Sequence, residues 1–256
     1  MKKLIVALSS IQGVAGVGLG GSRGLGIADE SSDYDFVLFR NGGDPINSGE
    51  ILKAVQKHEE LSANSHKIEV FEKDLHQVTK EIELAKQGKF IWSTRQLFPH
   101  GDLSTNQISH IMYLYICAER DHSITRLRQQ AEPFPEKLQH SLVKFFLSQA
   151  RITLIHATKI RKKEDLQYLV SLCSSFVFFT NIVLFALNNR YPVIEKGGAS
   201  LAFKLPITIY HYQLRIPFLF THICNGNYGL VVAELTALFE ELKALTEKAS
   251  LNLLQN

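Results

Sequence analysis

The chain has 256 residues, of which 45% are hydrophobic and 21% are charged, and its formal net charge at pH 7 is +3. These values are typical of a globular protein and exclude a disordered or low-complexity chain. The small positive charge does not by itself indicate a nucleic-acid-binding protein, and the length allows one large domain or two smaller ones.

In the N-terminal residues 1–8, two lysines are followed by an apolar run, a pattern that resembles the start of a signal peptide. The apolar run stops at Ser9 and Ser10, however, and cleavage near Ala15 would remove part of the strand predicted next. Three widely separated cysteines match no zinc-binding spacing, which favours buried free thiols in a reducing compartment. We therefore expect a cytoplasmic protein.

A glycine-rich turn follows the first predicted strand. Residues 14–19 are small and apolar, and they predict a buried strand that ends at Gly20. The glycines after it can adopt positive φ, and successive N–H groups in such a turn bind anions. In this turn Ser22 adds a hydroxyl donor, and Arg23 adds a cation that would reach a phosphate or pair with a nearby acid. Arg23 as a plain surface charge is the alternative.

Two aspartates follow the turn at the start of a second predicted strand, residues 34–39. Because alternate residues of a strand point to the same face, Asp33 and Asp35 would project together. Close carboxylates repel each other unless a cation lies between them, and Mg²⁺ prefers hard oxygen ligands of this kind. The structural alternative is that Ser32 and Asp33 only cap a turn.

A third acid lies in the segment His-Lys-Ile-Glu-Val-Phe, residues 66–71, whose polar and apolar residues alternate as in a strand. Glu69 is near its middle. Its carboxylate would bind a second metal or act as a general base toward an acceptor hydroxyl. An acid at a strand edge is the structural alternative.

Short strand-like and helix-like segments alternate through residues 1–98. Helices are predicted over residues 46–61 and 75–86, the first after a turn at residues 41–45 and the second ending before Gly88. This pattern indicates a small mixed sheet backed by helices.

Long helical periods dominate residues 99–256. Helices are predicted over residues 104–119, 136–161 and 166–189, and apolar residues between 231 and 245 recur on one helical face. We therefore predict an α+β fold, in which an N-terminal domain of residues 1–98 is followed by an all-α helical bundle of residues 99–256.

The predicted helix over residues 166–189 carries no charge and is long enough to span a bilayer. Its serines, threonine and asparagines are costly to expose to lipid, so we expect a buried helix of the bundle and no membrane partner.

A polar loop after that helix contains Lys196 beside Gly197 and Gly198. Lys196 is a candidate to reach a phosphate across a cleft between the two domains, with a plain solvated turn as the favoured alternative. For His100 and Asp102, near the domain junction, a structural role is favoured over a place in the same cleft.

The set Gly21-Ser22, Gly26, Ser32-Asp33-Tyr34-Asp35 and Glu69 resembles the motif of the nucleotidyltransferase superfamily of polymerase beta type. In spacing it is similar to the small bacterial aminoglycoside and lincosamide nucleotidyltransferases and their uncharacterised relatives. The resemblance implies that Gly21 and Ser22 hold the β- and γ-phosphates of a nucleoside triphosphate. It also implies that Asp33 and Asp35 bind metal ions, with Glu69 as the third carboxylate.

The same resemblance implies an enzyme that uses two Mg²⁺ ions and transfers a nucleoside monophosphate, AMP from ATP or its equivalent from another triphosphate, releasing pyrophosphate. The expected acceptor is a hydroxyl of a small molecule, such as an antibiotic, because the helical half is small for an RNA-binding apparatus. A protein side chain or an RNA end is the alternative acceptor. The alternative from another class is a non-catalytic nucleotide-binding or antitoxin-like protein.

Overall fold

The structure is a computed structural model that describes residues 1–59, 67–94, 100–160, 165–194 and 196–253. The chain divides into two compact units, the first formed by Met1–Ala85 with Ser104–Pro133 and the second by Lys86–Leu103 with Phe134–Asn256. These units differ from the predicted division after residue 98, because residues 104–133 return to the first unit and complete its sheet.

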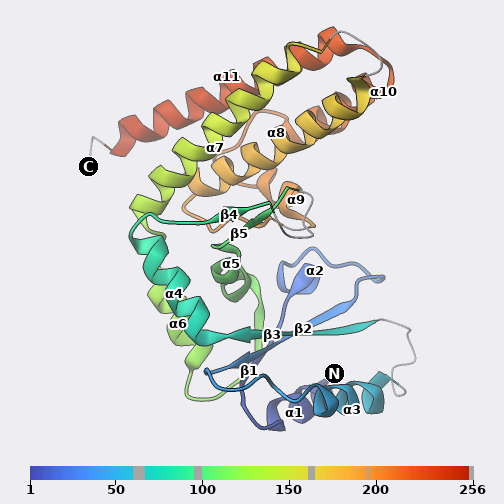
Figure 1. Cartoon of the computed structure of the whole chain (residues 1–256), viewed down its shortest axis with the longest axis vertical. Coiled ribbons are helices and arrows are strands. Elements are labelled where there is room, and N and C mark those ends of the chain that lie inside the picture. Colours follow the sequence, from blue (N-terminus) through green and yellow to red (C-terminus); the bar gives the residue numbers. More distant parts are fainter. Residues whose placement is uncertain (60–66, 95–99, 161–164, 195, 254–256) are drawn as a thin grey trace. The chain divides into compact units, whose positions relative to one another are not determined.

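A four-stranded mixed sheet forms the centre of the first unit, in the order β3-β2-β1-β6 (Figure 1). The central strand β1 pairs antiparallel with both β2 and β6, whereas β2 and β3 are parallel. The predicted small mixed sheet is therefore confirmed. Its strands are β1 (Val14–Leu19), β2 (Tyr34–Arg40), β3 (Ile68–Asp74) and β6 (Tyr115–Glu119).

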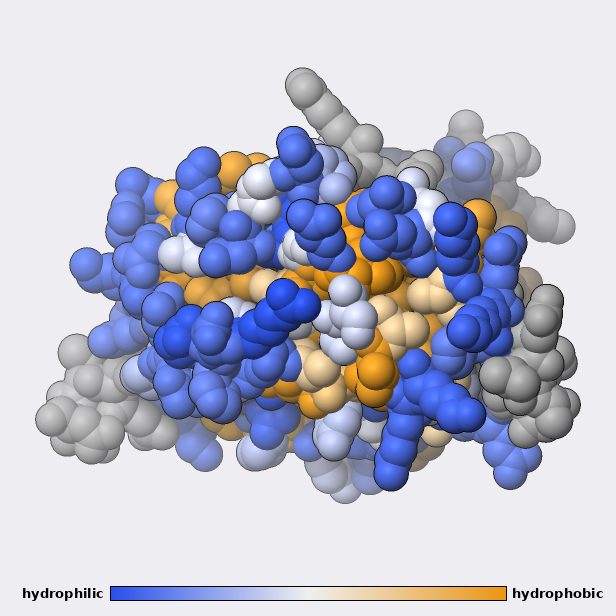
Figure 2. Space-filling model, turned by 90° about the horizontal axis from the view of Figure 1, so that it is seen from below, coloured by the Kyte–Doolittle hydropathy of each residue, from blue (hydrophilic) through white to orange (hydrophobic). Residues whose placement is uncertain are grey.

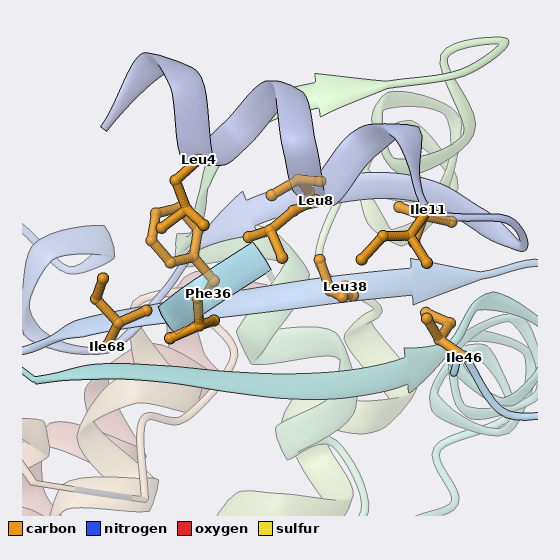
Figure 3. Close-up of a cluster of buried hydrophobic side chains, with 10 residues drawn as sticks. Leu4, Leu8, Ile11, Phe36, Leu38, Ile46 and Ile68 are labelled. Carbon is orange, nitrogen blue, oxygen red and sulfur yellow. The ribbon is translucent and has the colours of Figure 1, made fainter. Parts of the chain in front are cut away.

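One face of the sheet is covered by α1 (Lys2–Ser10) and α3 (Ser48–Glu59). Figure 3 shows Leu4 and Leu8 of α1 packed over Phe36 and Leu38 of β2. The N-terminal apolar residues, which resemble the start of a signal peptide, thus form a core helix.

Some apolar side chains of this unit are exposed, for example those of Val6 and Leu52. Figure 2 shows apolar residues surrounded by hydrophilic ones on the face seen from below.

On the other side of β1, helix α6 (Ser123–Ala131) and Leu114, the residue after helix α5 (Asn106–Tyr113), approach the strand closely because it contains glycines. A Cβ added at Gly16 would lie 2.7 Å from the side chain of Ile124 in α6, and one added at Gly18 would lie 2.6 Å from that of Leu114. Larger residues in β1 would push these elements away.

The helix predicted over residues 104–119 was wrong in its second half. Helix α5 ends at Tyr113, where Leu114 is extended (φ −72°, ψ 156°), and the chain continues as β6. The aromatic and β-branched residues of β6 suit a strand, and the backbone hydrogen bonds to β1 decide the outcome. Helix α4 (Leu75–Lys86) matches its prediction.

The second unit is helical and also contains a two-stranded ribbon of β4 (Trp92–Ser93) and β5 (Asp102–Leu103), which the all-α prediction missed. The helix predicted to reach Arg161 ends at Ala157, and Arg161 lies outside the described residues. The helices are α7 (Glu136–Ala157), α8 (Leu166–Leu187), α9 (Gly198–Ala202), α10 (Tyr212–Cys224) and α11 (Tyr228–Leu253).

Helix α8 is the one helix in the described part of the chain that is long and apolar enough to cross a membrane, and 72% of its most apolar window is buried inside the structure. Asn181 of α8 has a polar partner there, since the buried Tyr212 hydroxyl donates to its Oδ1 at 3.0 Å. Burial raises the pKa of the Cys173 thiol in α8 to about 12. All three cysteines are free, but the prediction of buried thiols holds only for Cys173, because Cys117 is half-buried and Cys224 is exposed.

Candidate active site

The glycine-rich turn forms a single helical turn, α2 (Gly21–Gly24), directly after β1. The N–H of Gly20 donates to the carbonyl of Asp35 at 2.8 Å, which ties the start of α2 to β2. Gly26 ends the turn with φ +69°, and the N–H of Ile27 donates back to the carbonyl of Ser22. Gly21 and Ser22 therefore lie in a first helical turn, where N–H groups have no acceptor within the helix.

Gly21 lies against the carboxylate of Asp35. A Cβ built on Gly21 would be 1.8 Å from Asp35 Oδ2, and its φ of +55° is in the left-handed region that favours glycine. Only a residue without a side chain permits this approach. The structure thus brings the predicted phosphate turn and the second aspartate together.

Asp35 and Glu69 are directly paired on the parallel strands β2 and β3. Paired residues of neighbouring strands share a face, so both carboxylates project from the same side of the sheet. Asp33 comes two residues before Asp35, and the adjacent Tyr34 donates its N–H to the carbonyl of Lys67 at 2.9 Å. The register therefore puts Asp33, Asp35 and Glu69 at the same ends of two neighbouring strands.

Lys67 is a fourth charged residue at this edge, which the sequence reasoning missed. Its ammonium forms an ion pair with Glu69 Oε1, and its side chain is 68% exposed. The hydrogen bond to Glu69 and the charges of Glu69, Asp33 and Asp35 raise the pKa of Lys67 above its ordinary value of 10.5. The signal was its position two residues before Glu69, which gives both side chains the same face of a strand.

Asp33, Asp35 and Glu69 suit a divalent cation in their chemistry, because carboxylates supply the hard oxygens that Mg²⁺ prefers. The pairing of β2 with β3 also puts them at the same ends of two neighbouring strands. Asp35 is brought close to the turn by the lack of a side chain at Gly21. Within the described residues, however, no three His, Cys, Asp or Glu side chains lie close enough together to hold an ion. Glu69 is instead engaged by Lys67, so a site with all three acids requires Glu69 to exchange that partner for the metal.

Arg23 of α2 contacts the segment that carries the aspartates. Its Nε donates to the carbonyl of Asp33 at 3.0 Å, and its Nη2 donates to that of Ser32 at 2.7 Å. Its guanidinium carbon lies 3.9 Å from the centre of the Tyr34 ring. Arg23 thus contacts the main chain of this segment, and its contact with a phosphate stays a prediction.

The remaining sequence candidates lie in the second unit. Lys196 is exposed in the turn before α9, and its contact with a phosphate stays a prediction. His100 is half-buried, and its Nε2 is 2.9 Å from the hydroxyl of Ser174. Burial lowers the pKa of His100. Asp102 is part of the short strand β5.

The N-terminal part of the chain matches a known protein family. Residues 1–99 match the family model described as "Nucleotidyltransferase domain", a segment that contains every residue of the predicted motif. This match confirms the resemblance to nucleotidyltransferases and supports nucleotidyl transfer as the general activity.

Among solved structures, a nucleotidyltransferase-like protein from Exiguobacterium sibiricum 255-15 is similar over 95% of this chain and 74% of its own, with 8% identity and a TM-score of 0.43. No curated protein matched the chain.

Proposed function

We propose that this protein is a Mg²⁺-dependent nucleotidyltransferase that transfers a nucleoside monophosphate, AMP from ATP, to a hydroxyl of a small molecule and releases pyrophosphate. The observation that carries the proposal is the pairing of Asp35 with Glu69 beside the Gly21-Ser22 turn, within the segment that matches the nucleotidyltransferase family. A phosphate-binding turn next to carboxylates is the arrangement that a metal–nucleotide substrate requires.

Each residue of the site has a role in this proposal. Asp33 and Asp35 would hold the metal ions, and Gly21 and Ser22 would hold the β- and γ-phosphates. Bound metal would neutralise phosphate oxygens and stabilise the attacking and leaving oxygens. In the reaction, the acceptor oxygen forms a bond to the α-phosphorus while the bond to pyrophosphate breaks. Glu69 would accept the hydroxyl proton after its carboxylate leaves the ion pair with Lys67.

The choice of acceptor rests on the similarity of the motif to that of enzymes that modify aminoglycosides and lincosamides. We therefore propose a small hydroxyl compound of the antibiotic type. A protein side chain and an RNA end are the alternative acceptors, and the experiment has to distinguish them from a small compound.

The first test is pyrophosphate release from ATP and Mg²⁺ over a panel of hydroxyl acceptors that includes aminoglycosides and lincosamides. Asp33→Asn and Asp35→Asn should each reduce release to background. Asp44→Asn, which removes an exposed carboxylate of the same domain, should leave release unchanged. If release survives both Asp33→Asn and Asp35→Asn, these residues do not hold the metal.

The acceptor class is tested with α-labelled ATP in a cell lysate. Label on a small solute supports the proposal, whereas label on a protein band or on RNA replaces the acceptor. Tight nucleotide binding without any label transfer would instead indicate a non-catalytic protein.

A further inference from the structure

Arg23 contacts main-chain groups nine and ten positions further along the chain. It belongs to α2, and its two donors reach the carbonyls of Ser32 and Asp33, just before β2 begins. The face of its guanidinium lies over the ring of Tyr34, the first residue of β2. The guanidinium therefore contacts the segment that carries the aspartates in two ways, since its N–H groups donate to the main chain and its face stacks on the Tyr34 ring.

Asp29 organises the middle of this loop through local hydrogen bonds. The carboxylate of Asp29 accepts hydrogen bonds from the N–H of Ser31 and from the hydroxyls of Ser31 and Ser32. The N–H of Ser32 donates to the carbonyl of Asp29. These bonds shape the loop itself. The hydrogen bond from the N–H of Gly20 to the carbonyl of Asp35 ties the start of the phosphate turn to β2, and Arg23 ties the same turn to the main chain of Ser32 and Asp33.

We propose that Arg23 is a positioning residue, which sets Asp33 relative to Asp35 and the Gly21-Ser22 turn by clamping the Ser32–Asp33 main chain. This inference rests on the proposed function, in which Asp33 holds a metal ion. Residues behind a metal ligand that fix its orientation typically contribute 10–100-fold to metal affinity or activity. A contact with the triphosphate, one of the roles that the sequence suggested for Arg23, is the competing role.

The guanidinium is suited to this role in a way that lysine is not. Its planar fork can donate to two oxygens at once while its face stacks on an aromatic ring, whereas an ammonium is a point charge. Arg23→Lys therefore keeps the charge near the phosphates but loses the clamp. Tyr34→Leu removes the ring under the guanidinium and leaves Arg23 itself in place.

The two roles predict different kinetics. If Arg23 positions Asp33, Arg23→Lys should raise the Mg²⁺ concentration for half-maximal rate by about 10–100-fold and leave the KM for ATP at saturating Mg²⁺ unchanged. Tyr34→Leu should shift the same quantity in the same direction by less. A raised KM for ATP with an unchanged Mg²⁺ requirement would overturn the proposal in favour of a phosphate contact. Arg126→Lys, at an exposed arginine of α6, is the matched control.

A second readout separates this inference from the proposed function. Mn²⁺ binding to the whole protein without nucleotide, followed by electron paramagnetic resonance, should weaken in Arg23→Lys and not in Arg126→Lys. Thermal melting checks that each variant is folded. Unchanged Mn²⁺ binding in folded Arg23→Lys overturns the role of Arg23 whether or not the protein turns over. Weakened binding in a protein without turnover supports Arg23 while removing the proposed function, and a wild-type chain that binds no Mn²⁺ overturns both.

Discussion

At the scale of single residues, Gly21 decides how near the second aspartate can come to the phosphate turn. The carboxylate of Asp35 occupies the space that a Cβ at Gly21 would fill, at 1.8 Å from Oδ2. Replacement of Gly21 therefore moves Asp35 or the turn, and either movement separates groups that the proposed reaction needs together.

We predict that Gly21→Ala lowers nucleotidyl transfer by about 100-fold, the usual effect of a misplacement of about 1 Å. The matched control is Gly43→Ala, because Gly43 also has positive φ (+75°) but has no atom within 4 Å of an added Cβ. Both variants incur the left-handed strain of about 1–2 kcal/mol, which denaturant unfolding measures. Only Gly21→Ala should lose activity, and equal losses in both variants would assign the effect to backbone strain.

Lys67 lies at the same strand edge as the candidate metal ligands. Its ammonium competes for Glu69 and adds positive charge near Asp33 and Asp35. We predict that Lys67→Met lowers the Mg²⁺ concentration for half-maximal rate several-fold, measured in the pyrophosphate assay. Lys53→Met makes the same change of net charge at an exposed position of α3 and should have no effect. A higher Mg²⁺ requirement in Lys67→Met would show that Lys67 assists the site instead.

At the scale of elements, Glu119 connects the edge strand β6 to helix α6. Its carboxylate accepts the N–H groups of Ile124 and Thr125, each at 3.0 Å, and also the hydroxyl of Thr125. Burial acts to raise the pKa of Glu119, but these hydrogen bonds outweigh it, so the pKa lies below its ordinary value of 4.5. The ionised form therefore stabilises the start of α6, which packs over Gly16 of β1 through Ile124.

We predict that Glu119→Gln lowers the free energy of unfolding at pH 7 by about 1–2 kcal/mol, because bonds to a charged acceptor become bonds to a neutral one. Since the folded pKa is the lower one, this stabilisation is present above pH 4.5 and is lost as the pH falls through the folded pKa. Urea unfolding should thus show a difference between wild type and Glu119→Gln that narrows in acid. Glu240→Gln, at an exposed residue of α11, is the control. A difference that stays constant with pH would contradict the charged role.

At the scale of the whole molecule, the family match and the compact unit do not coincide. The match covers residues 1–99, but the first unit omits residues 86–103 and includes Ser104–Pro133. Without the later segment, β1 loses its partner β6 and becomes an edge, and Gly16 and Gly18 lose the side chains that cover them. Unpaired edges of this kind promote aggregation.

We predict that residues 1–99 alone do not fold, whereas residues 1–85 joined to 104–133 by a Gly-Ser linker form a folded domain. The measurement is the dispersion of amide signals in a ¹⁵N–¹H spectrum, with sedimentation to detect aggregates. Equally dispersed spectra from both chains would mean that β6, α5 and α6 are dispensable for the first unit.

The site could be predicted largely from the sequence because its residues are local. Gly21, Ser22, Asp33 and Asp35 lie within fifteen residues of one another, and a turn between two strands has few geometries. The alternation of residues 66–71 also placed Glu69 on a strand. The contacts of these groups were harder to predict. The ion pair of Lys67 with Glu69 follows from their spacing along one strand, whereas the hydrogen bonds from Arg23 to Ser32 and Asp33 depend on how the loop between α2 and β2 folds back.

By itself, the sequence determined the elements whose pattern is periodic: the strand over 14–19, the helix over 75–86 and the long apolar helix α8. It also determined the family motif, because spacing and residue type carry that signal. Tertiary structure alone decided that residues 115–119 form a strand and that residues 104–133 rejoin the first unit. The physical reason is that β6 forms its hydrogen bonds with β1, a strand about a hundred residues earlier in the chain, and a local sequence pattern carries no information about a partner so distant.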